Sequence, residues 1–208
     1  DDVALPERLA KEAAFLDTYP GIAAVGSQTQ FFADGAVAAP TTCLPQSPAA
    51  IRAFLGRCCP FSHPSVMFRR QAVLDAGLYR PQMVPAEDYD LWLRLSERHD
   101  LANLPDVLLR YRLHSAQSTA NREEAVAVAT LVAQAAHRER LAGRPDPVDA
   151  AVSLSPDLLG LLGIREAAIS RQTLLTALSR SETLLAVTSS ESQAFGVLNM
   201  LKNDRVTK

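Results

Sequence analysis

The sequence of 208 residues contains no hydrophobic run that approaches the roughly 20 residues needed to span a bilayer. It has only three cysteines, Cys43, Cys58 and Cys59, with no CxxC spacing among them and no histidine cluster beside them. An odd and sparse set of this kind indicates reduced thiols in a cytosolic setting, and it argues against both a disulfide framework and a zinc site.

The sequence also lacks an excess of charge of either sign. Lys and Arg number 21 and Asp and Glu number 23, which gives a net charge of −2. This near balance argues against a nucleic-acid partner and against strong attraction to a membrane surface. With 48% hydrophobic residues the chain can bury a real core, so we expect one domain with an appendage. The chain begins at Asp1 rather than Met, so we expect its natural N-terminus to lie upstream. The sequence does not decide whether a targeting segment precedes it.

The first third of the chain predicts a helix followed by a sheet. Pro6 suits the first turn of a helix through "ERLAKEAAFLDTYP", which should end before Pro20. The stretch "IAAVGSQTQFF" has strand character. The "ADG" that follows at 33–35 is a turn signal and predicts a return strand.

Short helices and strands alternate in the next stretch. Ser47 and Pro48 predict the N-cap and first position of a helix, "HPSVMFRR" a buried strand, and "RQAVLDAGLY" a short helix closed at Gly77. A further helix should run from Glu87 to about residue 98. "LANLPDVLLRYRLH" then predicts two short strands broken at Pro105. This order predicts an α/β architecture.

From about residue 119 the pattern is helical. Residues 119–143 predict one long amphipathic helix that begins with acids, ends with bases and stops at a glycine. The two prolines of 144–150 predict a linker. Residues 151–208 show only helical patterning, and Ser155 marks a helix start. We expect these residues to form a helical extension.

Three carboxylates, Glu87, Asp88 and Asp90, lie within four residues, next to Trp92 and several leucines. Acids in a first turn complement the helix dipole, and Asp90 has Arg94 as a partner one turn on. Glu87 and Asp90 share a face and repel, and Asp88 has no cation one turn on. On spacing alone the structural account is the simpler one. A general base or a site for a metal-bound substrate is the alternative.

Other candidate residues also have two interpretations. His114 ends an apolar strand and His63 begins one, and isolated histidines there are more often surface or hydrogen-bonded residues than ligands. Trp92 lies among apolar positions and predicts a core or cleft-wall residue. Asp1 and Asp2 on their own are ordinary terminal residues.

Several stretches, in their order and spacing, resemble the second half of the catalytic domain of family 2 glycosyltransferases, which have the GT-A fold. The similarity runs from Asp1 to about Ser118. The stretches are "DDVALPERLAKEAAFLD", "IAAVGS", "CPFSHPSVMFRRQAVLDAGLY" and "AEDYDLWLRLSERHDLANLPDVLLRYRLH". The resemblance implies an incomplete GT-A fold over residues 1–118 with a C-terminal all-helical extension. The upstream half, which in relatives binds the nucleotide base and ribose, is absent.

The resemblance implies a divalent metal. In the family the last carboxylate of a D-x-D sequence holds the metal on the nucleotide diphosphate. Here Asp1 matches that carboxylate and Asp2 matches the Asp that commonly follows it, whereas the first Asp of the motif is absent. His114 matches a histidine that completes the metal and diphosphate site in many GT-A enzymes. The expected metal is Mg²⁺ or Mn²⁺, and a histidine nitrogen favours Mn²⁺.

The resemblance also assigns roles to the acids. Asp88 matches the residue usually taken as the catalytic base, and Glu87 receives a supporting role. Trp92, with His63 and Asp2, is expected in the wall of the substrate and acceptor site.

The implied reaction is an inverting transfer of a sugar from a nucleotide-diphosphate sugar to a hydroxyl acceptor, a glycan or a lipid-linked sugar, in the synthesis of a glycan or surface polysaccharide. The implied location is the cytoplasm, with peripheral association at the inner face of a membrane left open. Because the donor half is missing, we expect the chain alone to bind nucleotide sugars poorly and to be inactive. The alternative is a non-catalytic binding module whose helical tail docks a partner.

Overall fold

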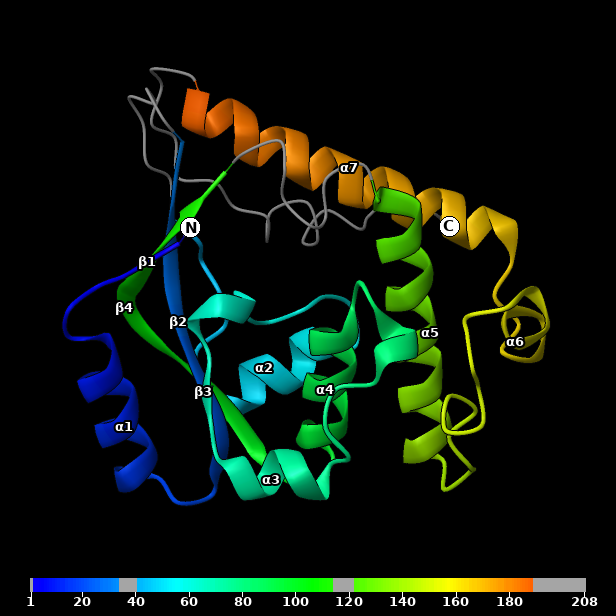
Figure 1. The fold of residues 1–208 in the computed structure, drawn as a ribbon, viewed down its shortest axis with the longest axis horizontal. Coiled ribbons are helices and arrows are strands. Elements are labelled where there is room, and N and C mark those ends of the chain that lie inside the picture. Colours follow the sequence, from blue (N-terminus) through cyan, green and yellow to red (C-terminus); the bar gives the residue numbers. More distant parts are fainter. Residues whose placement is uncertain (1, 34–40, 114–121, 189–208) are drawn as a thin grey trace.

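The computed structural model describes residues 2–33, 41–113 and 122–188, and these form an α/β structure (Figure 1). The elements in chain order are β1 (Val3–Ala4), α1 (Arg8–Thr18), β2 (Ile22–Phe32), α2 (Pro48–Leu55), the 3₁₀ helix η1 (His63–Ser65), β3 (Met67–Phe68), α3 (Arg70–Asp75), the 3₁₀ helix η2 (Pro81–Met83), α4 (Glu87–Ser96), β4 (Asp100–Arg112), α5 (Glu123–Leu141), α6 (Pro156–Leu161) and α7 (Glu166–Thr188).

The strands form one mixed sheet in the order β1-β4-β2-β3. The two long strands β2 and β4 pair in parallel, and the two-residue strands β1 and β3 pair antiparallel at the edges. In Figure 1 helix α1 lies on one side of this sheet, while α2, α4 and α5 lie on the other. A parallel pair covered on both faces explains why β2 is buried from Ile22 to Thr29.

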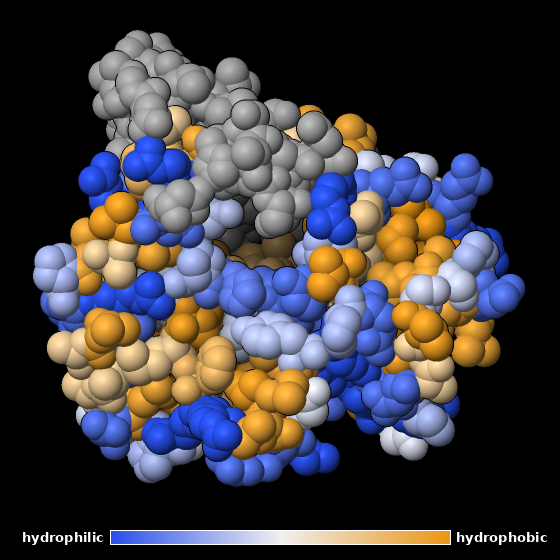
Figure 2. Space-filling view, viewed as in Figure 1, coloured by the Kyte–Doolittle hydropathy of each residue, from blue (hydrophilic) through white to orange (hydrophobic). Residues whose placement is uncertain are grey.

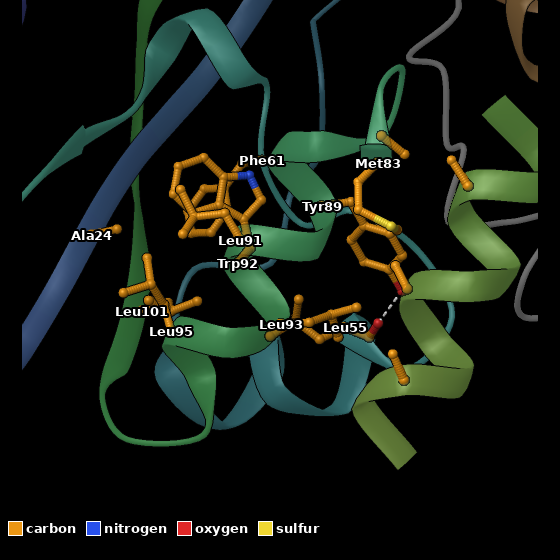
Figure 3. Close-up of a cluster of buried hydrophobic side chains, with 14 of the residues drawn as sticks. Ala24, Leu55, Phe61, Met83, Tyr89, Leu91, Trp92, Leu93, Leu95 and Leu101 are labelled. Atoms are coloured by element: carbon orange, nitrogen blue, oxygen red, sulfur yellow. Dashed lines mark hydrogen bonds between the residues drawn. The ribbon is translucent and has the colours of Figure 1, made fainter. Parts of the chain in front are cut away.

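Side chains of β2 divide the core into two parts. Val25 packs toward α1 with Leu16, Ala102 and Leu108. Ala24 packs in the larger cluster, which Trp92 and the leucines of α4 fill (Figure 3). Helix α4 therefore has its apolar side set against the sheet, and its first turn lies where the sheet meets the loops that carry η1 and η2.

Two predicted helix starts are confirmed with their caps. The Ser47 hydroxyl accepts a hydrogen bond from the Ala50 N–H at 3.3 Å, and Pro48 takes the first position of α2. The Ser155 hydroxyl does the same for the Leu158 N–H at the start of α6. Gly77 has a φ of +86° directly after α3, which fits the predicted glycine stop.

The prediction of two short strands broken at Pro105 is wrong. Strand β4 is continuous, and the irregularity is a bulge: Ser27 pairs with Leu104, but the next residue of β2, Gln28, pairs with Val107. Pro105 and Asp106 thus have no partner on β2, so the missing N–H of the proline breaks no ladder bond. The strand expected in "HPSVMFRR" is also shorter than predicted, because its first residues form η1. The expected return strand falls on 34–40, which lie outside the described residues; the only trace beside them is an isolated antiparallel bridge between Gln30 and Thr41.

The helical part of the chain shares the main core. Helix α5 packs on α4, and α7 crosses α5 (Figure 1). Ala133 and Ala136 of α5, Val148 and Leu158 belong to the same cluster of buried side chains as Trp92. In the part of the chain that the structure describes, no helix has both the length and the apolar character to cross a membrane.

The segment 144–150, expected to be a linker, is tied to that core by charge. Asp146 accepts hydrogen bonds from Arg80 at 2.9 Å and from Arg140 at 2.5 Å. Arg80 also holds the buried Asp90 of α4, through two nitrogens at 2.5 and 2.9 Å. The segment therefore joins the loop before α4 to the end of α5. The three cysteines are free, as predicted.

Candidate active site

The three acids of α4 point to different surroundings. Asp90 has no exposed surface and pairs with Arg94, as its spacing predicts, and with Arg80, which the sequence did not indicate. It belongs to the core. Glu87 and Asp88 occupy the first two positions of α4 and are half-buried at its positive end.

Asp88 uses its two carboxylate oxygens differently. Oδ1 accepts a hydrogen bond from the Tyr89 N–H at 2.7 Å, and Oδ2 lies 3.7 Å from His63 Nδ1. The side chain keeps 22% of its surface exposed, so a ligand can reach the carboxylate. Burial raises the pKa of Asp88 above its usual value, although the Tyr89 N–H and His63, when its ring is protonated, act to lower it. A carboxylate with a raised pKa and one open oxygen has the properties of a general base.

His63 stands between Asp88 and Tyr79. Its Nε2 lies 3.0 Å from the Tyr79 hydroxyl, and its ring meets that of Trp92 edge-on at 6.1 Å between centroids. The imidazole is 44% exposed, so it lies at the surface of the site. Burial raises the pKa of Tyr79, and the charges of Asp88 and Glu87 add to this effect, so the phenol stays protonated.

Trp92 has no exposed surface in this structure. It packs against Phe61 at 5.4 Å and lies inside the cluster drawn in Figure 3. This burial agrees with the core position that the sequence indicates, and the place of the ring in an acceptor wall stays a prediction. Its contribution is to support the His63 ring from behind.

Asp2 lies beside the end of β4. Its Oδ1 accepts a hydrogen bond from the Arg112 N–H at 2.9 Å, which fixes it at the end of β4. Burial raises the pKa of Tyr111, and the charges of Asp2 and Asp88 both raise it further. The pKa of Tyr111 therefore depends on the charges of both carboxylates. Two of the expected residues, Asp1 and His114, lie outside the described residues.

Tyr79 and Tyr111 were missed by the sequence analysis. Both lie inside the stretches that carry the family resemblance, but neither has a spacing that suggests a function. Their positions follow from the turn at Gly77 and from the register of β4, which only the folded chain reveals. Among the described residues, no group of three His, Cys, Asp or Glu side chains is arranged to hold a metal ion.

A groove of about 790 Å³ opens where the loop before α4 approaches the helical part of the chain. Gln82 and Val84 line it from that loop, Arg122 and Glu124 from the start of α5, and Thr173 from α7. In Figure 2 the surface in this view carries both hydrophilic and hydrophobic side chains around a central hollow. The groove therefore lies between the helical part of the chain and the loop that leads into the acids of α4.

Two known proteins are similar to this chain over 116 residues. One, named amylovoran biosynthesis glycosyltransferase AmsE, from Erwinia amylovora, is 38% identical; the match covers 55% of this chain and 43% of that protein. The other, named an uncharacterized glycosyltransferase, from Haemophilus influenzae, is 33% identical over 54% of this chain and 42% of that protein. The chain spans less than half the length of these curated relatives. No protein-family model matches it. The two matches support a glycosyltransferase family.

Proposed function

We propose that this chain is the acceptor-side part of a family 2 glycosyltransferase of the GT-A kind, which transfers a sugar from a nucleotide-diphosphate sugar to a hydroxyl group with inversion. The names of the two relatives support sugar transfer, and that of AmsE supports a role in polysaccharide synthesis. The observation that carries the proposal is the setting of Asp88, whose Oδ1 accepts a hydrogen bond from the backbone, whose Oδ2 faces His63, and whose side chain stays partly exposed.

In the proposed step, Asp88 Oδ2 takes the proton of the acceptor hydroxyl. The acceptor oxygen forms its bond to the anomeric carbon of the donor as the bond to the diphosphate oxygen breaks, and the nucleoside diphosphate leaves with that electron pair. Asp88 lies in the first turn of α4, where the helix dipole favours the ionised carboxylate that must receive the proton. Glu87 supports the site, since its Oε2 is buried and has no hydrogen-bond partner within the described structure, which leaves it ready to accept from a hydroxyl.

A divalent ion, Mg²⁺ or Mn²⁺, is proposed to neutralise the departing diphosphate. The expected ligands are Asp1 and His114, both outside the described residues. The described neighbour of Asp1 is Asp2, whose carboxylate is engaged by the Arg112 N–H. This arrangement fits a position beside a metal site rather than a ligand within it.

The first test is donor turnover by the full-length protein that contains this chain. A panel of nucleotide sugars is supplied with Mn²⁺ or Mg²⁺ and candidate acceptors, and release of nucleoside diphosphate is measured. Asp88→Asn should reduce kcat by about 10²–10⁴-fold, which corresponds to roughly 3–5 kcal/mol of barrier lowering, because general base catalysis contributes that much.

The matched control is Asp17→Asn, the same change at an exposed position near the end of α1. It should leave the rate unchanged. Near wild-type turnover by Asp88→Asn would remove Asp88 from the role of base. Absence of release with every donor and acceptor would contradict the transferase and favour the binding module.

A further inference from the structure

The two carboxylate oxygens of Asp88 have different contacts. The Tyr89 N–H donates a 2.7 Å hydrogen bond to Oδ1, so Oδ2 is the better placed of the two oxygens to receive a proton. The side chain that faces Oδ2 is His63, whose Nδ1 lies 3.7 Å away. This distance is within ion-pair range but too long for a direct hydrogen bond, so Oδ2 keeps room for a hydroxyl.

The His63 ring is held from its other side. Nε2 lies 3.0 Å from the Tyr79 hydroxyl, and Trp92 backs the ring edge-on. Tyr79 follows directly from the turn at Gly77 and Leu78, both of which have positive φ, so the backbone that carries the phenol is tightly specified. The imidazole therefore has one orientation in which both of its nitrogens have partners.

The charges around the ring select one tautomer. The carboxylate of Asp88 favours a hydrogen on Nδ1, the nitrogen that faces it. Nε2 then has no hydrogen and accepts one from the Tyr79 hydroxyl, which burial keeps protonated. The opposite tautomer would aim a nitrogen lone pair at the negative oxygen.

We propose that His63, oriented by Tyr79, is the positioning residue of Asp88 and carries its hydrogen on Nδ1 toward Asp88 Oδ2. The inference deepens the proposed function, because it rests on Asp88 as the base; the geometry of the ring does not depend on that function. Asp88 of α4, His63 of η1 and Tyr79 of the loop after α3 then act together: a hydrogen bond joins Tyr79 to His63, and His63 Nδ1 faces Asp88 Oδ2 at 3.7 Å.

Other titratable groups also face Asp88. They are Glu87 on α4, Cys59 after α2, Tyr79 after α3 and Tyr111 on β4. Burial holds the Cys59 thiol and both phenols in their neutral forms by raising their pKa values. Glu87 carries a negative charge that raises the pKa of Asp88, whereas His63 lowers it. His63 is therefore the described side chain that favours the ionised form of the base.

The first experiment reads the tautomer directly and needs no activity. Long-range ¹H–¹⁵N spectra of the imidazole groups are recorded on the 208-residue chain, and His63→Gln identifies the His63 signals. We expect the Nδ1–H tautomer in the wild type and a loss of that preference in Asp88→Asn and in Tyr79→Phe. Tyr19→Phe and Asp75→Asn, at exposed positions away from the ring, are the matched controls and should leave the signals unchanged. A wild-type Nε2–H tautomer, or signals that ignore both site variants, would overturn the inference.

The second experiment follows the proton on Asp88. Titration of its ¹³C-labelled carboxyl group should give a higher pKa in His63→Gln than in the wild type, and His99→Gln is the matched control. In the full-length enzyme, His63→Gln should lower kcat by about 10–100-fold with little change in the KM of the acceptor, because a misplaced base costs rate rather than binding. The acid limb of its pH profile should move to higher pH.

The two levels of failure are distinguishable. If the tautomer and the carboxyl titration behave as expected but no donor is turned over, the unit of His63, Tyr79 and Asp88 stands and the proposed function falls. If turnover depends on Asp88 while His63→Gln changes neither kcat nor the pH profile, the function stands and the positioning role falls.

Discussion

At the scale of single residues, neighbouring carboxylates of α4 differ because their environments differ. Asp90 is fully buried and accepts hydrogen bonds from both Arg80 and Arg94, which makes it part of the core. Asp88, two positions earlier, is partly open and has a raised pKa, so its proton can exchange. The pairing of Asp90 with Arg94 was predictable from their spacing. Arg80 was not, because it reaches Asp90 from a loop rather than from the same helix.

Asp90→Asn should destabilise the protein by about 3–5 kcal/mol, because it leaves two largely buried guanidinium groups without their common anion. The free energy of unfolding from urea denaturation measures this loss. Asp100→Asn makes the same chemical change at an exposed ion pair with Arg52, 2.6 Å long, and should cost about 0–1 kcal/mol. Equal losses in the two variants would contradict the account of Asp90.

At the scale of elements, strand β2 depends on a small residue where the loop after α2 crosses it. A Cβ on Gly26 would lie 2.4 Å from Asn103 Oδ1 and 2.7 Å from Phe61 Cδ1. Phe61 in turn packs against Trp92, which backs His63. The close approach of β2 therefore sets the position of the ring behind the candidate site.

Gly26→Ala should lower the free energy of unfolding by about 1–3 kcal/mol, because the added methyl group forces Phe61 and Asn103 to move. Thermal unfolding followed by circular dichroism tests this. Gly56→Ala is the matched control: no atom lies within 4 Å of its Cβ position and its φ is −66°, so the change should be neutral or slightly stabilising. A wild-type melting temperature for Gly26→Ala would show that the strand can give way.

Elements with local signals were predictable from the sequence. The helix starts at Ser47 and Ser155 carry capping side chains, and strand β2 has its predicted bounds, because caps and apolar runs act over a few residues. The continuity of β4 was not predictable. A proline normally ends a strand, and only the register against β2 creates the bulge that accommodates Pro105.

At the scale of the whole molecule, one chain of ion pairs connects the α/β part to the helical part. Asp146 binds Arg80 and Arg140. Arg140 binds Glu97, the residue that follows α4, at 2.8 Å, and His137 contacts the same carboxylate at 2.7 Å. The two prolines of 144–150 predicted a linker. They did not indicate that Asp146 would form ion pairs with arginines elsewhere in the chain. The same limit applied to the candidate site, where His63 and Tyr79 meet Asp88 only through the fold.

The connection should weaken in acid. Burial acts to raise the pKa values of Glu97 and Asp146, but hydrogen bonds and cationic neighbours outweigh it and hold both pKa values below their usual range. Groups of this kind stabilise the fold above their unfolded pKa values, about 4, and lose that contribution as the pH falls through the folded values, because the unfolded state then binds more protons.

Asp146→Asn should cost about 1.5–3 kcal/mol at pH 7, and the difference from the wild type should shrink below about pH 4. Urea unfolding at pH 7 and pH 3 measures both values. The variant must be compared with the wild type at each pH, because other groups also change the stability of the fold in acid. Asp88 and Glu12 have pKa values raised chiefly by burial, so their contribution to stability increases as the pH falls. Asp149→Asn is the control, because Asp149 contacts the same Arg80 at 3.0 Å but is 74% exposed. A pH-independent difference would exclude the ion pairs as its source.

The position of Trp92 gives the protein a built-in optical reporter. It is the only tryptophan in the sequence, it is fully buried, and its indole meets the His63 ring at 6.1 Å. Indole emission depends on solvent contact and is quenched by a nearby imidazolium. The intrinsic fluorescence of this chain therefore comes from a single ring directly behind Asp88, and changes in protonation or occupancy at that surface can be followed without a label.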